Sequence, residues 1–175
     1  MDLGKSAVMR GYKGDPDRTI GIVGPVPGVP KAVFLQRVVS HFPSTEAVFG
    51  FDDEAADVDE SIEPEIKAVA IMNAFHPEEV DKVANIALGM GIIPSIDEGD
   101  GILYLTGAVR ELGLQAALVK RMAVICVGHR TCEEWGIEYM AEVMNKTWPP
   151  IRVDVILEDE SVAAKEDKPL ASPDT

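Results

Sequence analysis

Residues 122–134 read M-A-V-I-C-V-G-H-R-T-C-E-E, and this stretch decides the fold. The apolar run 122–127 predicts a buried strand, Gly128 predicts a tight turn, and the amphipathic run 135–144 predicts a helix. A buried strand that passes through a short turn into a helix is typical of α/β proteins. This stretch therefore predicts an α/β fold for the chain.

The turn in this stretch carries a pair of side chains that can bind a metal. His129 follows the turn glycine, and Glu133 lies four residues further on, at the predicted helix start. An imidazole nitrogen and a carboxylate oxygen directed at one point beyond the strand end are suitable ligands for a divalent cation. The chain has only three histidines, which gives the placement of His129 added weight.

Helix capping explains the same stretch without a metal. Thr131 and Glu134 have the spacing of a capping box, in which a hydroxyl at the helix start is followed by a carboxylate three residues later. Acidic residues in a first helical turn also interact favourably with the helix dipole. Because Glu133 and Glu134 are separate residues, capping and metal binding are compatible, and both interpretations stay open.

Length and charge limit the classes of function. The 175 residues suffice for one sizeable core or two small lobes, and the net charge is −14. Such an excess of acidic residues argues against nucleic acid and against an anionic membrane surface as partners. No apolar run reaches the length of a membrane span, and no secretory signal is visible at the start of the sequence. A cytoplasmic location is therefore expected.

The two cysteines flank the decisive turn. Cys126 lies on the apolar run and is expected to be a small core residue. Cys132 lies in the predicted first helical turn, where a thiol pKa can be lowered. Their spacing is not that of a C-x-x-C pair, so neither a redox motif nor a zinc pair is predicted.

Residues 1–51 divide into a lead-in and a first structural unit. The polar, glycine-containing residues 1–17 predict an irregular lead-in, and residues 19–23 predict a strand. The run G-P-V-P-G-V-P at 24–30 predicts a loop, because prolines remove backbone donors and fix φ. A helix from Pro30 to about His41 and a short strand at 46–49 complete the first unit, 18–51.

An acidic loop at 52–65 separates the first unit from a second one. The loop has eight acidic residues and no basic one, which is typical of a solvated segment. The second unit, 66–157, is predicted to hold the remaining elements, and residues 158–175 are predicted to be a disordered acidic tail. The predicted strands of the second unit are 66–72, 102–105, 122–127 and 151–157, and its helices are 77–88, 109–119 and 135–145.

The alternation of strands and helices predicts an α/β fold with a largely parallel or mixed sheet. Binding sites in such sheets lie beyond the carboxyl ends of the strands. Thr106-Gly107 and Gly128-His129 both follow predicted strands directly. If those strands are neighbours, the two turns converge on one cleft.

Four segments in order resemble one protein family. They are R-T-I-G-I-V-G at 18–24, I-K-A-V-A-I-M at 66–72, Y-L-T-G at 104–107, and the G-H-x-x-x-E turn at 128–133. Together they resemble the C-terminal part of Nif3-like proteins, also called GTP cyclohydrolase I type 2 homologues. The resemblance implies an oligomeric protein with a dinuclear metal site, in which His129 and Glu133 are ligands of zinc, iron or manganese.

The chain departs from the family pattern in its other ligands. Family members are longer, and their N-terminal half supplies a His-His pair and an Asp, whereas this chain has no adjacent histidines. Two explanations stay open: a separate chain or a removed segment supplies the missing ligands, or the site is vestigial. His76, which follows the predicted strand 66–72, is a candidate third ligand, with the alternative that it only precedes a helix that begins at Pro77.

Two functions follow from these observations. The first is a divalent-metal-binding, Nif3-like protein, in the form of a metal-dependent hydrolase whose site is incomplete in this chain. The second is a non-catalytic, oligomeric binding or regulatory module with a vestigial metal site. A homo-oligomer is expected in either case, and the predicted strand 151–157 would offer an edge for pairing.

Overall fold

A computed structural model describes residues 6–51 and 64–157 of the chain. The predicted disordered tail and nearly all of the predicted acidic loop lie outside the described residues. The chain divides into two compact units, residues 1–133 and residues 134–175. The first unit contains the whole sheet, and the second consists, in its described part, of most of the last helix and the segment after it.

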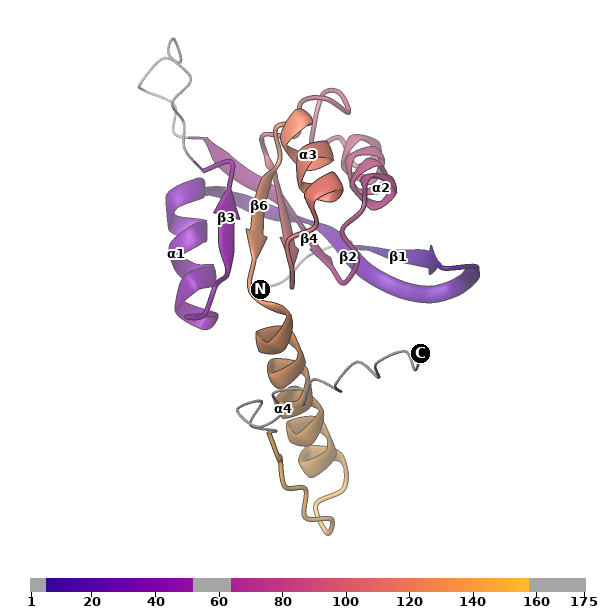
Figure 1. The fold of residues 1–175 in the computed structure, drawn as a ribbon, viewed down its shortest axis with the longest axis vertical. Coiled ribbons are helices and arrows are strands. Elements are labelled where there is room, and N and C mark those ends of the chain that lie inside the picture. The colour runs from indigo at the N-terminus through magenta and orange to yellow at the C-terminus, as the bar shows by residue number, and fades with distance from the viewer. Residues whose placement is uncertain (1–5, 52–63, 158–175) are drawn as a thin grey trace, which may run out of the picture. The chain divides into compact units, whose positions relative to one another are not determined.

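The first unit is built on one six-stranded mixed sheet (Figure 1). The strand order is β1-β2-β4-β5-β6-β3, in which β4, β5 and β6 are parallel and the other pairings are antiparallel. The strands are β1 (Ala7–Tyr12), β2 (Asp15–Pro30), β3 (Ala47–Phe49), β4 (Glu65–Met72), β5 (Ile102–Thr106) and β6 (Ala123–Cys126). The expected α/β fold with a mixed sheet is confirmed.

Helices cover both faces of this sheet. They are α1 (Lys31–His41), α2 (Pro77–Gly89) and α3 (Glu111–Val119), whereas α4 (His129–Thr147) follows β6 and belongs mostly to the second unit. Apolar residues of α2 and α3 pack with one set of strand residues, and Phe34 and Val38 of α1 pack with the alternate set. Because side chains alternate across a strand, this division places α1 on the opposite face from α2 and α3.

The central strands are apolar because helices cover them on both sides. β6 is buried along its whole length, and β5 has a single half-buried residue, Leu105. These are the strands that the sequence predicted best, since a continuous apolar run flanked by glycine leaves few alternatives. The predicted helices 77–88 and 109–119 also correspond closely to α2 and α3.

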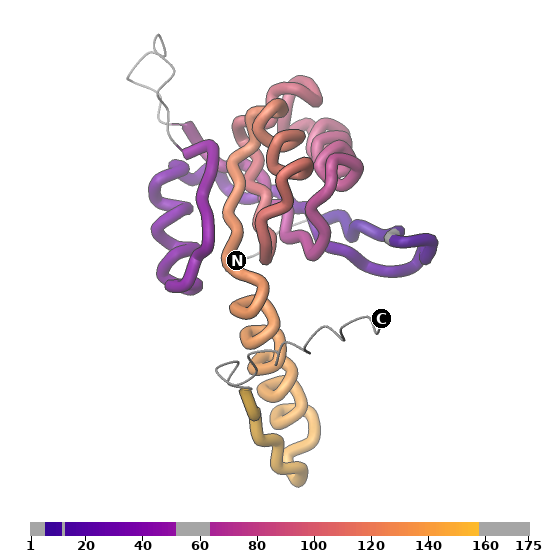
Figure 2. The backbone as a smooth tube through the Cα atoms, in the orientation of Figure 1, coloured from indigo at the N-terminus to yellow at the C-terminus, as the bar shows by residue number. Residues whose placement is uncertain are grey.

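The N-terminal region differs from the prediction. Residues 7–12 form β1, which pairs with β2 as the long hairpin that Figure 2 traces in indigo. β2 continues through the proline-rich run at 24–30, where a loop was predicted. The prolines are tolerated because β1 pairs with β2 only as far as Val23, so that beyond this point one edge of β2 needs no donors for β1. A register shift between Pro25 and Val29 absorbs the remaining irregularity.

Two predictions about the C-terminal region were wrong. α4 begins at His129, so Thr131 lies inside the helix and cannot be its N-cap. The described residues 151–157 contain no strand. The earlier helix start has a consequence for the site, because it places His129 and Glu133 on consecutive turns of one helix. Within the described ranges, no helix is long and apolar enough to span a membrane.

Gly113 is expected to be required for the packing of α3 on the loop after β4. A Cβ built on Gly113 would lie against the carbonyl oxygen of Phe75 and 2.7 Å from its carbonyl carbon. Gly113→Ala should therefore lower the free energy of unfolding by about 1–3 kcal/mol in urea denaturation, despite the better helix propensity of alanine. Gly89→Ala is the matched control, because a Cβ there meets no atom within 4 Å. A Gly113→Ala protein as stable as the wild type would contradict this packing.

Candidate functional site

The two turns expected to converge are held together by backbone hydrogen bonds. The Val127 amide donates to the Thr106 carbonyl at 2.9 Å, and the Gly128 amide donates to the Gly107 carbonyl at 2.7 Å. These bonds continue the parallel ladder of β5 and β6 past the ends of both strands. The predicted convergence of Thr106-Gly107 and Gly128-His129 is confirmed.

Small residues allow the two turns to approach closely. Gly128 has φ +97°, a conformation that other residues rarely adopt. A Cβ on Gly107 would lie 3.4 Å from Cys132 Sγ and 3.6 Å from the Cα of His129. The first turn of α4 therefore lies directly over the Thr106-Gly107 turn, and its side chains are presented at the carboxyl edge of the sheet.

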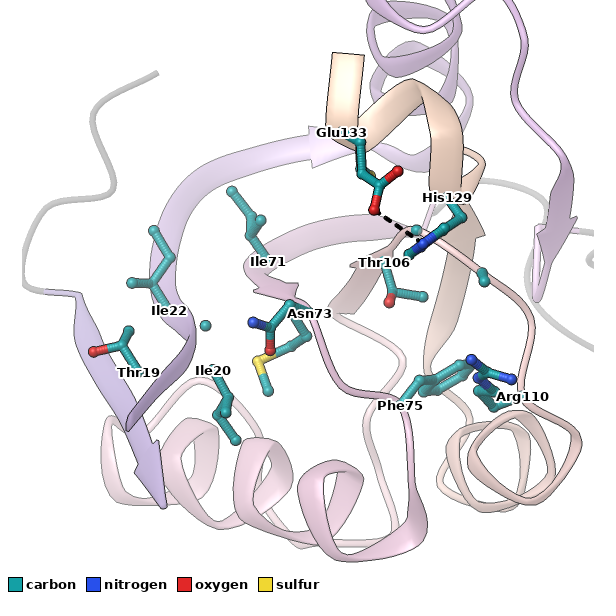
Figure 3. A pocket seen from close by; sticks show the side chains of 15 residues that line it. Thr19, Ile20, Ile22, Ile71, Asn73, Phe75, Thr106, Arg110, His129 and Glu133 are labelled. Carbon is teal, nitrogen blue, oxygen red and sulfur yellow. Dashed lines mark ion pairs between the residues drawn. The ribbon is translucent and has the colours of Figure 1, made fainter. Parts of the chain in front are cut away.

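His129 and Glu133 form a pair on the first two turns of α4 (Figure 3). His129 Nε2 and Glu133 Oε1 are 3.1 Å apart, and the two side chains are 77% and 64% exposed. Residues four apart on a helix lie on the same face, so the helix itself sets this separation. Both polar atoms are accessible to a ligand that approaches the edge of the sheet.

The geometry of this pair fits a shared metal ion. Two ligand atoms that each lie about 2.0–2.2 Å from one cation are separated by roughly 2.8–3.1 Å at a right angle and roughly 3.3–3.6 Å at the tetrahedral angle, so the observed 3.1 Å fits neighbouring positions of an octahedral ion. Imidazole and carboxylate are also the ligand types that zinc, iron and manganese accept. Over residues 6–51 and 64–157, however, no group of three or more His, Cys, Asp and Glu residues could hold a metal ion. The described part of the chain thus brings together two side chains of metal-binding type and no third one.

His76 lies apart from this pair. It precedes α2 and lines a different cavity, together with Glu78, Glu79 and Lys82. The loop after β4 carries His76 past the sheet edge to the start of the helix. The structure therefore brings His129 and Glu133 together and does not bring His76 to them.

A cavity of about 580 Å³ opens beside the His129–Glu133 pair. Its lining combines polar groups at the carboxyl edge of the sheet with apolar side chains from β2, β4 and the loop after β4 (Figure 3). The lining residues are Thr19, Ile20, Gly21, Ile22, Ile71, Met72, Asn73, Phe75, Thr106, Gly107, Ala108, Arg110, His129, Cys132 and Glu133. This combination is that of a small-molecule site.

Several lining residues could not be selected from the sequence. Asn73 follows β4 directly, so the rule that sites lie at strand ends could have identified it. Phe75 and Arg110 lie in loops with no motif around them. Residues 19–22 belong to β2, whose place beside β4 is visible only once the strand order is known.

Comparisons with known proteins support the fold. No family model matched the sequence, and no curated protein matched it significantly. Among solved structures, a protein named ybgI, of unknown function, matches with a TM-score of 0.50 and 19% identity, over 82% of this chain and 47% of that chain. The expected resemblance to Nif3-like structures is confirmed at the level of the fold.

Two further solved structures match at lower similarity. A Bacillus cereus protein related to NIF3 has a TM-score of 0.45 and 13% identity, over 79% of this chain and 32% of that one. Reduced HcgD from Methanocaldococcus jannaschii has a TM-score of 0.45 and 17% identity, over 73% and 43% of the two chains. The chain thus spans less than half the length of each structure named here.

The two thiols differ in environment but share the direction of their pKa shifts. Cys126 is fully buried in β6, and burial together with the nearby Glu46 raises its pKa to about 11. Cys132 is exposed at the cavity, and partial burial of its thiol and then the charge of Glu133 raise its pKa. A raised pKa lowers the thiolate fraction at neutral pH, so the lowered pKa expected from the helix start is wrong.

We expect Glu133→Gln to accelerate alkylation of Cys132. Loss of the carboxylate charge lowers the thiol pKa, so more thiolate is present at pH 8, below that pKa. The measurement is the rate of iodoacetamide labelling, followed by peptide mass spectrometry, with buried Cys126 as an internal unlabelled reference. Glu138→Gln removes the same charge five residues further along α4 and should leave the rate unchanged. An equal acceleration in both variants would contradict a local effect of Glu133.

Proposed function

We propose that this chain is a divalent-metal-binding protein in which His129 and Glu133 are two ligands of the metal. The observation that carries the proposal is the 3.1 Å separation of their ligand atoms at the carboxyl edge of the sheet. The adjoining cavity gives a bound molecule access to the same point. The resemblance to Nif3-like proteins is consistent with this assignment.

The finer proposal is a metal-dependent hydrolase whose centre is completed by other groups. A metal bound there would lower the pKa of a coordinated water and polarise a substrate oxygen. Specific sites generally use three or more protein ligands, and this chain contributes two of them. The remaining ligands would come from a separate chain or from a segment beyond this sequence.

We expect His129→Ala to reduce affinity for zinc and manganese at least tenfold, since one of two protein ligands is lost. The measurement is equilibrium dialysis of untagged protein against each metal, with elemental analysis of the protein fraction. Glu133→Gln should weaken binding in the same way, because an amide oxygen is a poorer ligand than a carboxylate.

The other two histidines supply controls for this experiment. His41→Ala lies at the end of α1, outside the cavity, and should bind metal like the wild type. His76→Ala should also be unchanged if its separate cavity plays no part. A wild-type protein that binds neither metal, or a His129→Ala protein that binds them equally well, would overturn the proposal.

The second candidate function is a non-catalytic module that assembles with copies of itself. A stripe on α4 favours it, in which Trp135, Tyr139 and Val143 are spaced four residues apart, with exposed fractions of 55%, 55% and 40%. The Trp135 and Tyr139 rings are stacked, with centroids 5.7 Å apart. A contiguous exposed apolar stripe of this kind is typical of a surface buried on association.

Tyr139→Glu is expected to lower the mass of the assembly in light scattering after size exclusion. A carboxylate in the middle of the stripe would be buried without a partner in any interface formed there. Gln115→Glu, at an exposed position of α3, adds the same charge elsewhere and should leave the mass unchanged. A wild-type protein that is monomeric at high concentration would exclude self-association through this stripe.

A further inference from the structure

The geometry points to an oxyanion subsite in the cavity, formed by Arg110, Thr106 and the start of α3. We infer that the cavity takes a small molecule that combines an oxyanion with an apolar body. The subsite is distinct from the His129–Glu133 pair, although both line one cavity. In Figure 3, Arg110 lies near Phe75 in the view, below His129.

Arg110 is the only lysine or arginine among the residues that line the cavity. In the part of the chain that the structure describes, its guanidinium makes no hydrogen bond or ion pair. The protein has a net charge of −14, so carboxylates are available for ion pairs with exposed arginines. Arg110 instead lines the cavity. A guanidinium presents a fork of donors that matches the oxygens of carboxylate or phosphate.

Thr106 provides the second and independent observation. The residue is only 6% exposed, but its hydroxyl is not among the buried polar atoms that lack a partner, so within the described residues it remains accessible from the cavity. An accessible threonine hydroxyl can donate a hydrogen bond to a ligand oxygen. Thr106 lines the same cavity as Arg110, so the cavity contains a hydroxyl donor besides the guanidinium.

Two helix starts add to the positive potential at this edge. Arg110 is the N-cap residue of α3 and makes no side-chain capping bond, so the first amides of that helix retain donor capacity. The first turn of α4 begins at the neighbouring strand end, at His129. The positive ends of helix dipoles favour anions, and the cavity also has a cationic side chain and a threonine hydroxyl.

The apolar residues that line the cavity indicate that the ligand has an apolar body besides its oxyanion. Phe75 is 2% exposed, and its ring packs against Tyr104 with centroids 4.7 Å apart. The Tyr104 hydroxyl in turn donates to the Ala74 carbonyl at 2.6 Å, which fixes that contact. The cavity thus has a rigid aromatic element near Arg110 and aliphatic side chains, such as Ile20 and Ile71, on the β2 and β4 side. An oxyanion alone would leave this apolar surface uncovered.

The test is a titration of the metal-free full chain with inorganic phosphate and, separately, with acetate at constant ionic strength. Binding is followed by two-dimensional NMR through the amides of Thr106 and Gly107. We expect saturable shifts at these residues for at least one of the two anions. Arg110→Gln should weaken binding about ten- to a hundredfold, as expected for a charged hydrogen bond. Thr106→Val should weaken it less, because one neutral donor is lost.

Arg37→Gln is the matched control, because it removes the same charge from an exposed position of α1 outside the cavity. Stronger binding of phosphate or of acetate identifies the preferred oxyanion, and either result supports the subsite if Arg110→Gln abolishes it. Absence of saturable shifts with both anions would overturn it, as would equal binding by the wild type and Arg110→Gln. Because the titration is metal-free and can be repeated on His129→Ala, failure of the metal proposal would not affect its outcome.

Discussion

The parallel pairing of β5 with β6 is the constraint on which the rest of the site depends. Its ladder extends by two hydrogen bonds beyond the strands, from Val127 and Gly128 to Thr106 and Gly107. These bonds fix the direction in which α4 begins, because the helix follows Gly128 at once. A helix that starts there has no freedom to move His129 away from the sheet edge, so a backbone interaction, rather than a side-chain contact, determines where the candidate ligands lie.

The sequence predicted the parts of the fold whose physical signal is local. The apolar runs of β4, β5 and β6 are short, continuous and bounded by glycine or polar residues, so their assignment as buried strands needed no knowledge of their neighbours. A local sequence pattern does not predict a strand whose formation depends on its neighbours in the sheet. The proline-rich half of β2 is a strand because β4 lies on one side of it and β1 does not reach the other. At 151–157 the alternation is that of a strand, but no strand forms among the described residues.

The residues of the candidate site also differ in whether a local sequence pattern could predict them. His129 and Glu133 could be predicted because their relation is local, being one helical repeat apart. Phe75, Arg110 and residues 19–22 could not, because only the order of strands in the sheet brings them into one cavity. His76 shows the opposite difficulty. It follows the same strand as Phe75, but Phe75 lines the cavity beside the His129–Glu133 pair, whereas His76 lines a separate one. Proximity in sequence to a strand end is therefore an incomplete guide to a shared site.

The two proposed subsites have consequences for each other. Among the described residues that line the 580 Å³ cavity, Glu133 is the only carboxylate and Arg110 the only permanent cation. A divalent cation on the His129–Glu133 pair would offset the carboxylate charge and leave the cavity with an excess of positive potential, which favours an oxyanion at Arg110. By thermodynamic reciprocity, an oxyanion bound at Arg110 would strengthen metal binding by the same factor. Because the two subsites are distinct, this coupling would act through charge alone and would not require the oxyanion to coordinate the metal.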